Sequence, residues 1–351
     1  MSKFINSLAD VAELKIDKNR FLSATHEEIR SGATTDIYFV NTRDVLSSVG
    51  RLDVQVAAEV FARGEGVFAG LGEVKELLKT LPISMEALPE GEIFSPKETL
   101  VRIRGSYRDF GIYETAILGF LASSSGWAKA ARECVRAAGG TTSAGGKPVL
   151  SFGARHLHPS VASVMDSVAV KIGGCAGASS ILGAKLFGGI PSGTVPHTAV
   201  LLMGDTLSLA KAYDAALPSD IGRIFLVDTF KDETEESLRL AEALGDKLDA
   251  VRLDTPGERG GVTPDLVREL RYRLDSAGFN HVKIVATGGL TPDRIRALAE
   301  AGADVFGVGS YIAHAEPIDM TMDIKEIEGK PIAKRGRLPG ILANPRLVHI
   351  Q

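Results

Sequence analysis

The sequence contains few cysteines and few aromatic residues, and it has no long apolar run. Its 351 residues include two cysteines, Cys134 and Cys175, which lie far apart and form no CxxC pair. We therefore expect neither a zinc knuckle nor a disulfide framework. No segment approaches the roughly 18 uninterrupted apolar residues that a membrane helix needs. We expect a cytoplasmic protein without a membrane partner.

A surplus of positive charge is also missing. The formal net charge is −4, with 24% charged and 44% hydrophobic residues. We expect no nucleic-acid partner, because nucleic acid is bound through a basic surface. The composition is that of an ordinary folded protein, and the length suffices for two domains with a buried core.

Short apolar runs recur from Pro148 onward, and each is followed by a helix-like segment. Seven such runs are present, at residues 149–152, 169–172, 193–195, 224–227, 250–253, 282–286 and 305–308. Alternating strands and helices indicate parallel βαβ units, and about seven units favour a barrel over an open sheet. We therefore predict an incomplete, about seven-stranded α/β barrel over residues 131–315.

The flanking segments are predicted to form a second domain of mixed helices and strands. A helical pattern over residues 113–131 crosses from this domain into the barrel, whereas residues 34–38 form a polar turn that opens a strand-like segment. The tail alternates charged and apolar residues over 322–335, which indicates a hairpin. We therefore expect residues 1–130 to form the N-terminal domain and residues 316–351 to complete it.

Glycine-rich loops follow the last two predicted barrel strands. A glycine pair after a strand lets backbone N–H groups approach an anion, and the next helix adds its positive end. One such loop would be explained more simply as a chain turn. Two loops on consecutive strands match the usual phosphate position in βα barrels. The residues predicted to bind phosphate are Gly288, Gly289, Gly307, Gly309 and Ser310.

An arginine and a histidine also lie at predicted strand ends. Arg155 follows Phe152 by three residues, so its guanidinium can grip a carboxylate while the ring offers a stacking face. A pair between Arg155 and a structural carboxylate explains the pattern equally well. His197 follows a Gly-Thr-Val-Pro turn. It is a candidate nucleophile or acid–base group, although an isolated histidine is usually structural or solvated.

Two carboxylates end neighbouring predicted strands. Asp228 and Asp254 are candidates to hold Mg²⁺ through few protein ligands when phosphates supply the others. Arg252 projects beside Asp254. The competing interpretation is a buried arginine–aspartate pair that seals the mouth of the barrel.

Several segments together resemble type II phosphoribosyltransferases of pyridine metabolism. They are residues 35–39, 152–159, 172–175, 193–197, 252–256 and 288–289. Their order and spacing are most similar to the nicotinate phosphoribosyltransferase branch, across nearly the whole chain. The resemblance implies an incomplete α/β barrel, an N-terminal α/β sandwich that receives the C-terminal tail, and a homodimer or higher homo-oligomer.

The resemblance also implies a role for each matching residue at the base end of the site. Arg155 and Phe152 would bind the carboxylate and ring of nicotinate. Tyr38 would cover the pyridine ring across a dimer interface, with Asp36 supporting it.

The other end of the site would hold phosphoribosyl pyrophosphate (PRPP). Arg252 and Asp254 would contact its ribose and pyrophosphate, and the glycine loops would hold its 5′-phosphate. His197 matches the histidine that this branch phosphorylates with ATP. The implied reaction converts nicotinate and PRPP into nicotinate mononucleotide and pyrophosphate, with Mg²⁺ and coupled ATP hydrolysis, in NAD salvage.

Three alternatives stay open at this point. Quinolinate phosphoribosyltransferase is expected to use a larger basic cluster for two carboxylates and no phosphorylated histidine. A catalytically idle metabolite-binding homologue is suggested only by Ala176, where family members often carry an acidic residue. A barrel enzyme that acts on another phosphorylated sugar is opposed only by the segments that contain Arg155 and Tyr38.

Overall fold

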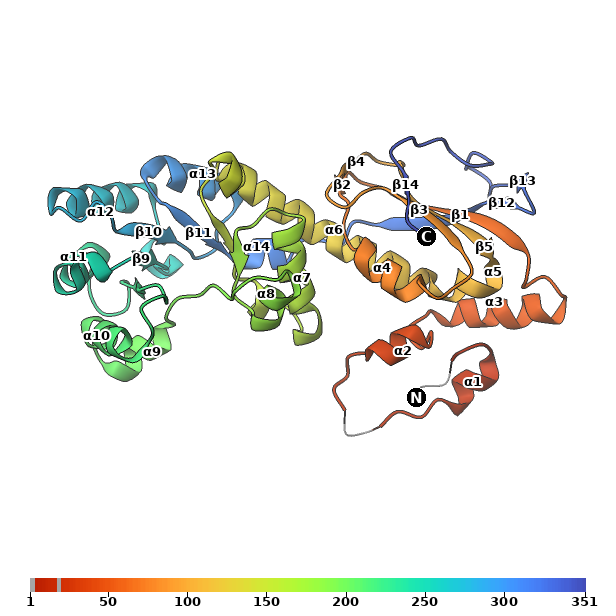
Figure 1. Ribbon diagram of the computed structural model, residues 1–351, viewed down its shortest axis with the longest axis horizontal. Coiled ribbons are helices and arrows are strands. Elements are labelled where there is room, and N and C mark those ends of the chain that lie inside the picture. Colours follow the sequence, from red (N-terminus) through yellow and green to blue (C-terminus); the bar gives the residue numbers. More distant parts are fainter. Residues whose placement is uncertain (1–3, 18–19) are drawn as a thin grey trace. The chain divides into compact units, whose positions relative to one another are not determined.

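The computed structural model describes residues 4–17 and 20–351. The chain divides into two compact units, coloured along the sequence in Figure 1. Unit 1 comprises Met1–Lys129 and Glu316–Gln351, and unit 2 comprises Ala130–Ala315. The long helix α6 (Glu114–Ala137) begins in unit 1 and ends in unit 2.

Unit 1 is built on an antiparallel sheet whose strand order is β13-β12-β1-β5-β3-β14. These strands are β1 (Gln55–Ala62), β3 (Ser84–Ala87), β5 (Thr99–Ser106), β12 (Met320–Ile327), β13 (Lys330–Pro331) and β14 (Val348–His349), and a separate pair is formed by β2 (Gly66–Val67) and β4 (Ile93–Phe94). The helices are α1 (Leu8–Glu13), α2 (His26–Arg30), α3 (Ile37–Ser48), α4 (Leu71–Leu78), α5 (Tyr107–Phe110) and the 3₁₀ turn η1 (Gly111–Tyr113). Side chains of β1, β3, β5, α4 and α6 share one apolar core. This arrangement confirms the antiparallel sandwich.

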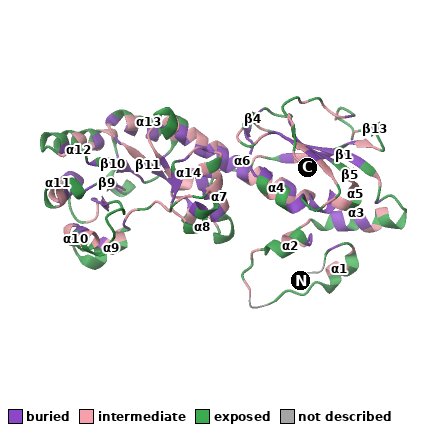
Figure 2. Cartoon of the chain, viewed as in Figure 1, coloured by how far each residue is buried: buried purple, intermediate pink, exposed green. Residues whose placement is uncertain are grey.

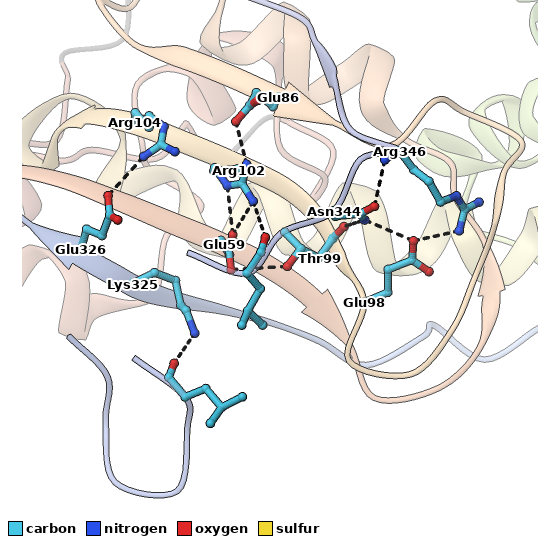
Figure 3. A network of polar contacts seen from close by, with 12 residues as sticks. Glu59, Glu86, Glu98, Thr99, Arg102, Arg104, Lys325, Glu326, Asn344 and Arg346 are labelled. Carbon is cyan, nitrogen blue, oxygen red and sulfur yellow. Dashed lines mark hydrogen bonds and ion pairs between the residues drawn. The ribbon is translucent and has the colours of Figure 1, made fainter. Parts of the chain in front are cut away.

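The C-terminal tail belongs to this unit. Strands β12 and β13 form the hairpin, and β14 pairs with β3. A buried charge anchors the tail, because Arg102 pairs with Glu59 and Glu86 and also donates to the carbonyl oxygen of Leu342 (Figure 3). These partners replace the hydrogen bonds that the guanidinium would make with water, and they offset the cost of burying its charge.

The strand-like segment expected after residue 34 is wrong. Residues from Ile37 onward form helix α3, and Asp36 is its N-cap residue. Phe39, Val40 and Arg43 are the buried positions of this helix, and their spacing fits a helical face. The local run of β-branched and aromatic residues favours a strand, but burial of this face in tertiary contacts overrides that preference.

Unit 2 contains a six-stranded parallel sheet in the described part of the chain, with the order β7-β6-β11-β10-β9-β8. The strands are β6 (Val149–Ser151), β7 (Gly177–Ala178), β8 (Ile224–Leu226), β9 (Ala250–Leu253), β10 (Lys283–Ala286) and β11 (Val305–Val308). The α-helices are α7 (Pro159–Lys171), α8 (Ile181–Leu186), α9 (His197–Met203), α10 (Thr206–Ala216), α11 (Glu233–Leu244), α12 (Pro264–Ser276), α13 (Pro292–Ala301) and α14 (Ser310–Ala313), and the 3₁₀ turns are η2 (Thr142–Ala144), η3 (Ala154–His156), η4 (Gly245–Lys247) and η5 (Gly257–Arg259).

This sheet is barrel-like and open. Among the described residues, β7 and β8 are edge strands that do not pair with each other. Figure 2 shows the strands buried and the outer faces of α11 and α12 exposed. The α/β class and the incomplete barrel are therefore confirmed. Separately, no helix among the described residues is long and apolar enough to cross a membrane.

Two of the seven predicted barrel strands are wrong. Residues 169–172 lie at the end of helix α7, whose buried residues Ala162, Met165 and Ala169 recur at helical spacing. The strand in this region is β7, which is too short to give an apolar run. Residues 193–195 form no strand and lead into α9.

Candidate active site

The polar residues expected at the barrel mouth lie at the carboxyl ends of three adjacent strands. Strand β9 lies between β8 and β10, with Leu226 paired to Arg252 and Ala286 paired to Leu253. Parallel strands bring the residues after their ends to one edge. Asp228, Asp254 and Thr287 therefore gather at the same edge of unit 2.

Arg252 is the centre of a hydrogen-bond network. Its Nε donates to Thr287 Oγ1 at 3.0 Å, its Nη1 donates to Thr194 Oγ1 at 2.7 Å, and its Nη2 donates to Asp254 Oδ2 at 2.9 Å. The Phe152 ring lies 5.8 Å from the guanidinium carbon. Three of five N–H donors are used, so the guanidinium is fixed in place and retains hydrogen-bonding capacity. The pair between Arg252 and Asp254 that the sequence offered as an alternative is thus present, but it is only partly buried.

His197 and Asp228 form a second pair. His197 is the first residue of α9, and its half-exposed ring places Nε2 3.2 Å from Asp228 Oδ2. The Asp228 side chain is 1% exposed, and its Oδ1 has no hydrogen-bond partner among the described residues. Burial raises the pKa of Asp228 above its ordinary value, and the contact with His197 acts in the opposite direction. The carboxylate can orient the imidazole and stabilise its charged form.

The β10 loop leaves backbone N–H groups available. Gly288 and Gly289 have φ values of 89° and 58°, a left-handed conformation that favours glycine. Arg294 donates to both of their carbonyl oxygens at 3.0 Å. Their N–H groups make no hydrogen bond within the described chain. Thr291 then caps α13, with Pro292 in its first turn. Consecutive amides in this geometry form an anion-binding concavity.

The β11 loop is built differently. Gly307 is buried in the strand, and a Cβ there would lie 2.6 Å from atoms of Phe152 and Thr287. We therefore attribute Gly307 to packing. Gly309 and Ser310 lie beyond the strand, and their N–H groups have no partner in the part of the chain that the structure describes. The phosphate-binding role expected of these two residues stays a prediction.

The residues expected to bind the base lie in both units. Arg155 is exposed on η3, after Phe152, and it makes no hydrogen bond or ion pair with any described residue. Tyr38 and Asp36 lie on and before α3 in unit 1, where Asp36 accepts a hydrogen bond from Thr115. Partial desolvation and the neighbouring Asp36 raise the pKa of the exposed Tyr38. Arg155 is thus a guanidinium that is available to a carboxylate ligand.

Sequence reasoning missed the residues that support this site. Thr194 and Thr287 hold Arg252, and Arg294 holds the carbonyls of the β10 loop. Both threonines lie in segments that contain other candidate residues, so their position was a usable signal. Arg294 lies on α13 and binds the carbonyl oxygens of the loop that precedes this helix. No sequence pattern indicates such a contact.

No group of three or more histidine, cysteine, aspartate or glutamate side chains among the described residues is arranged to hold a metal ion. Asp228 and Asp254 lie at the carboxyl ends of the barrel strands, and Asp228 has a buried oxygen without a hydrogen-bond partner among the described residues. This pair of carboxylates fits a cation that already has phosphate ligands of its own.

The fold and this geometry define a barrel-like α/β protein whose site lies at the carboxyl ends of its strands. Residues 36–125 match the family described as quinolinate phosphoribosyl transferase, N-terminal domain, and residues 128–323 match its C-terminal domain. The chain belongs to this family, the type II phosphoribosyltransferases. At the level of class, it is a phosphoribosyltransferase of pyridine nucleotide biosynthesis.

Individual relatives carry two different names. A crystal structure of nicotinate-nucleotide pyrophosphorylase from Pyrococcus furiosus is 44% identical, with a TM-score of 0.86, and the match covers 92% of this chain and 82% of that one. The nicotinate phosphoribosyltransferase pncB2 of Mycobacterium tuberculosis is 29% identical over 322 residues, covering 86% of this chain and 67% of that protein. A probable carboxylating nicotinate-nucleotide pyrophosphorylase of Methanothermobacter thermautotrophicus is 24% identical, covering 78% and 90% respectively.

Proposed function

We propose that this protein is a nicotinate phosphoribosyltransferase that couples transfer to ATP hydrolysis through a phosphorylated His197. The contact between His197 and the buried Asp228 carries this proposal. A histidine that served only as a solvated helix-end residue would not need a buried carboxylate, whose desolvation is costly. Relatives named nicotinate phosphoribosyltransferase support the same assignment.

The geometry suggests how His197 reacts. With Nε2–H donated to Asp228, the Nδ1 lone pair is the nucleophile toward the γ-phosphorus of ATP. The new N–P bond forms as the P–O bond to ADP breaks, and Asp228 stabilises the positive charge on the ring. Water later removes the phosphoryl group and regenerates histidine.

Phosphoribosyl transfer uses the rest of the mouth. The nicotinate nitrogen attacks the anomeric carbon of PRPP, the C–O bond to pyrophosphate breaks, and charge develops on the leaving group while the sugar becomes cation-like. Arg252 is fixed in advance to face the developing negative charge, and Asp254 to face the sugar. Mg²⁺ enters as part of the PRPP substrate, and it neutralises pyrophosphate charge when bound.

Nicotinate requires one carboxylate to be neutralised. Arg155, which has no carboxylate partner among the described residues, fits this requirement through two parallel hydrogen bonds. We further propose that Tyr38 and Asp36 are supplied by the partner subunit of a homodimer.

The alternative is quinolinate phosphoribosyltransferase. The descriptions of the matching family, which name quinolinate phosphoribosyl transferase, favour it. A product assay decides between them, with PRPP, Mg²⁺ and either nicotinate, quinolinate or nicotinamide, each with and without ATP. We expect nicotinate mononucleotide from nicotinate, with ATP stimulation that His197→Ala removes. Release of CO₂ from quinolinate with nicotinate untouched would assign the alternative, and no product from any base would indicate a binding homologue.

A further inference from the structure

His156 lies against the β11 loop, next to Gly309. A Cβ built on Gly309 would lie 3.1 Å from His156 Nε2, so the imidazole occupies the space that a side chain at position 309 would fill. The neighbouring Gly153 is equally constrained, because its Cβ would lie 3.1 Å from the Gly309 carbonyl oxygen. The η3 turn and the β11 loop are thus packed backbone to backbone, with the His156 ring at their junction.

The ring has two basic neighbours, Arg155 and His314. His156 and His314 rings meet edge to face at 5.3 Å, and His314 follows directly on α14. Burial, Arg155 and His314 all lower the pKa of His156. Neither ring nitrogen of His156 has a hydrogen-bond partner among the described residues. A half-buried imidazole with two basic neighbours and no partner is an environment that favours an anion.

The same junction presents unused backbone donors. The N–H groups of Gly309 and Ser310 donate no hydrogen bond to the described residues. Two free backbone donors and one imidazole nitrogen therefore lie close together. Phosphate oxygens prefer this combination of fixed N–H groups and nearby positive charge.

We infer that His156 is a ligand of the sugar 5′-phosphate, which it binds through Nε2–H next to the amides of Gly309 and Ser310. This inference rests on the proposed PRPP site and adds to it a side chain that titrates. A bound phosphate dianion stabilises the imidazolium, so phosphate binding raises the proton affinity of His156. His314 and Arg155 are the charged or titratable groups recorded against this ring, and both favour the anion as well.

The first test is a direct titration that needs no turnover. The protein is labelled with ¹³C-histidine, its ring signals are followed against pH by NMR, and the His156 signal is assigned with His156→Gln. Adding ribose 5-phosphate is expected to raise the pKa of His156, whereas ribose without phosphate leaves it unchanged. His281→Gln serves as the matched control, because His281 is exposed on a loop at the opposite ends of the strands.

The second test separates binding from catalysis. His156→Leu is expected to raise the KM for PRPP by about 10- to 150-fold, the size expected for one hydrogen bond to a charged group, with a smaller effect on kcat. His156→Gln retains an N–H donor and is expected to recover most of the affinity. It should also bind ribose 5-phosphate with a weaker dependence on pH than the wild type does, since titration of the phosphate itself is common to both proteins.

The outcomes distinguish this inference from the proposed function. If the His156 signal is unchanged by ribose 5-phosphate while nucleotide is still produced, His156 is not a phosphate ligand and the proposed function stands. If the signal shifts but no pyridine yields product, His156 binds phosphate and the proposed function is wrong. A His156→Leu protein that is folded by circular dichroism and keeps an unchanged KM for PRPP would also overturn the inference.

Discussion

The hydroxyl of Thr287 and the guanidinium of Arg252 are joined by a 3.0 Å hydrogen bond between two adjacent strands. The same hydroxyl lies 2.8 Å from Asp254 Oδ1 and 3.0 Å from the Leu253 carbonyl oxygen. Thr287 is buried, so no water competes for these contacts. The Thr287 hydroxyl thus contacts both Arg252 and Asp254, the two charged groups that are proposed to act on PRPP.

Thr287→Val is therefore expected to lower kcat/KM for PRPP. The substitution keeps the shape of the side chain and removes the hydroxyl, which leaves Arg252 Nε without its partner in a partly buried site. A loss of about 10- to 100-fold corresponds to roughly 1.4–2.8 kcal/mol. Steady-state kinetics measures it. Thr287→Ser, which restores the hydroxyl, should recover most of the activity, and equal losses in both variants would contradict this role.

Gly288→Ala is expected to weaken PRPP binding beyond its effect on stability. Gly288 has a φ of 89°, and its Cβ would lie 3.1 Å from Asp254 Oδ1. Gly278 is the matched control, because its φ of 88° is nearly the same and nothing lies within 4 Å of its Cβ position. Both variants should lose about 1–2 kcal/mol of unfolding free energy through the left-handed backbone. Only Gly288→Ala should raise the KM for PRPP, and equal KM values in the two variants would show that the loop is only a turn.

Arg155→Ala is expected to raise the KM for nicotinate while leaving the KM for PRPP nearly unchanged. Loss of a bidentate guanidinium–carboxylate contact costs about 2–3 kcal/mol, or about 30- to 150-fold in affinity. Arg155→Lys should recover only part of this, because an ammonium group cannot form the paired hydrogen bonds. Arg296→Ala, which removes an exposed arginine paired with Asp293 on α13, is the control. If the KM for PRPP rises instead, Arg155 belongs to the sugar end of the site.

Glu114 is expected to make unit 1 less stable in alkaline solution. Burial is the main cause that raises its pKa to about 7, with Asp323 adding to the shift and Lys334 opposing it. A raised carboxyl pKa gives stability that is complete below the unfolded value near 4.5 and is lost as the pH rises through about 7. Glu114→Gln stays neutral, so its unfolding free energy should exceed that of the wild type by about 1–3 kcal/mol at pH 8 and by much less at pH 5.

Urea denaturation at the two pH values measures this difference. Glu65→Gln removes an exposed carboxylate of the same unit and should show no such dependence on pH. A constant difference between Glu114→Gln and the wild type at both pH values would mean that Glu114 remains ionised in the folded protein.

Much of the barrel and its mouth followed from the sequence. Strands β6, β8, β9, β10 and β11 were predicted because each is a short apolar run that ends in polar or glycine residues. Parallel pairing then brings those ends to one edge, which is why the proximity of Asp228, Arg252 and Asp254 was predictable. The sandwich was expected from resemblance in short segments, and the nicotinate branch, expected from the same segments, stays a prediction.

Tertiary structure decided the features that depend on contacts between distant segments. Ala169 lies on the buried face of α7, and a short run such as 169–172 does not by itself distinguish such a face from a strand. Helix α3 forms where local preference favours a strand, because its buried face packs into unit 1. Arg294, Thr287 and His156 gained their positions only when the loops folded against one another. The sequence determined which residues stand at the strand ends, and the packing of those ends determined what each one contacts.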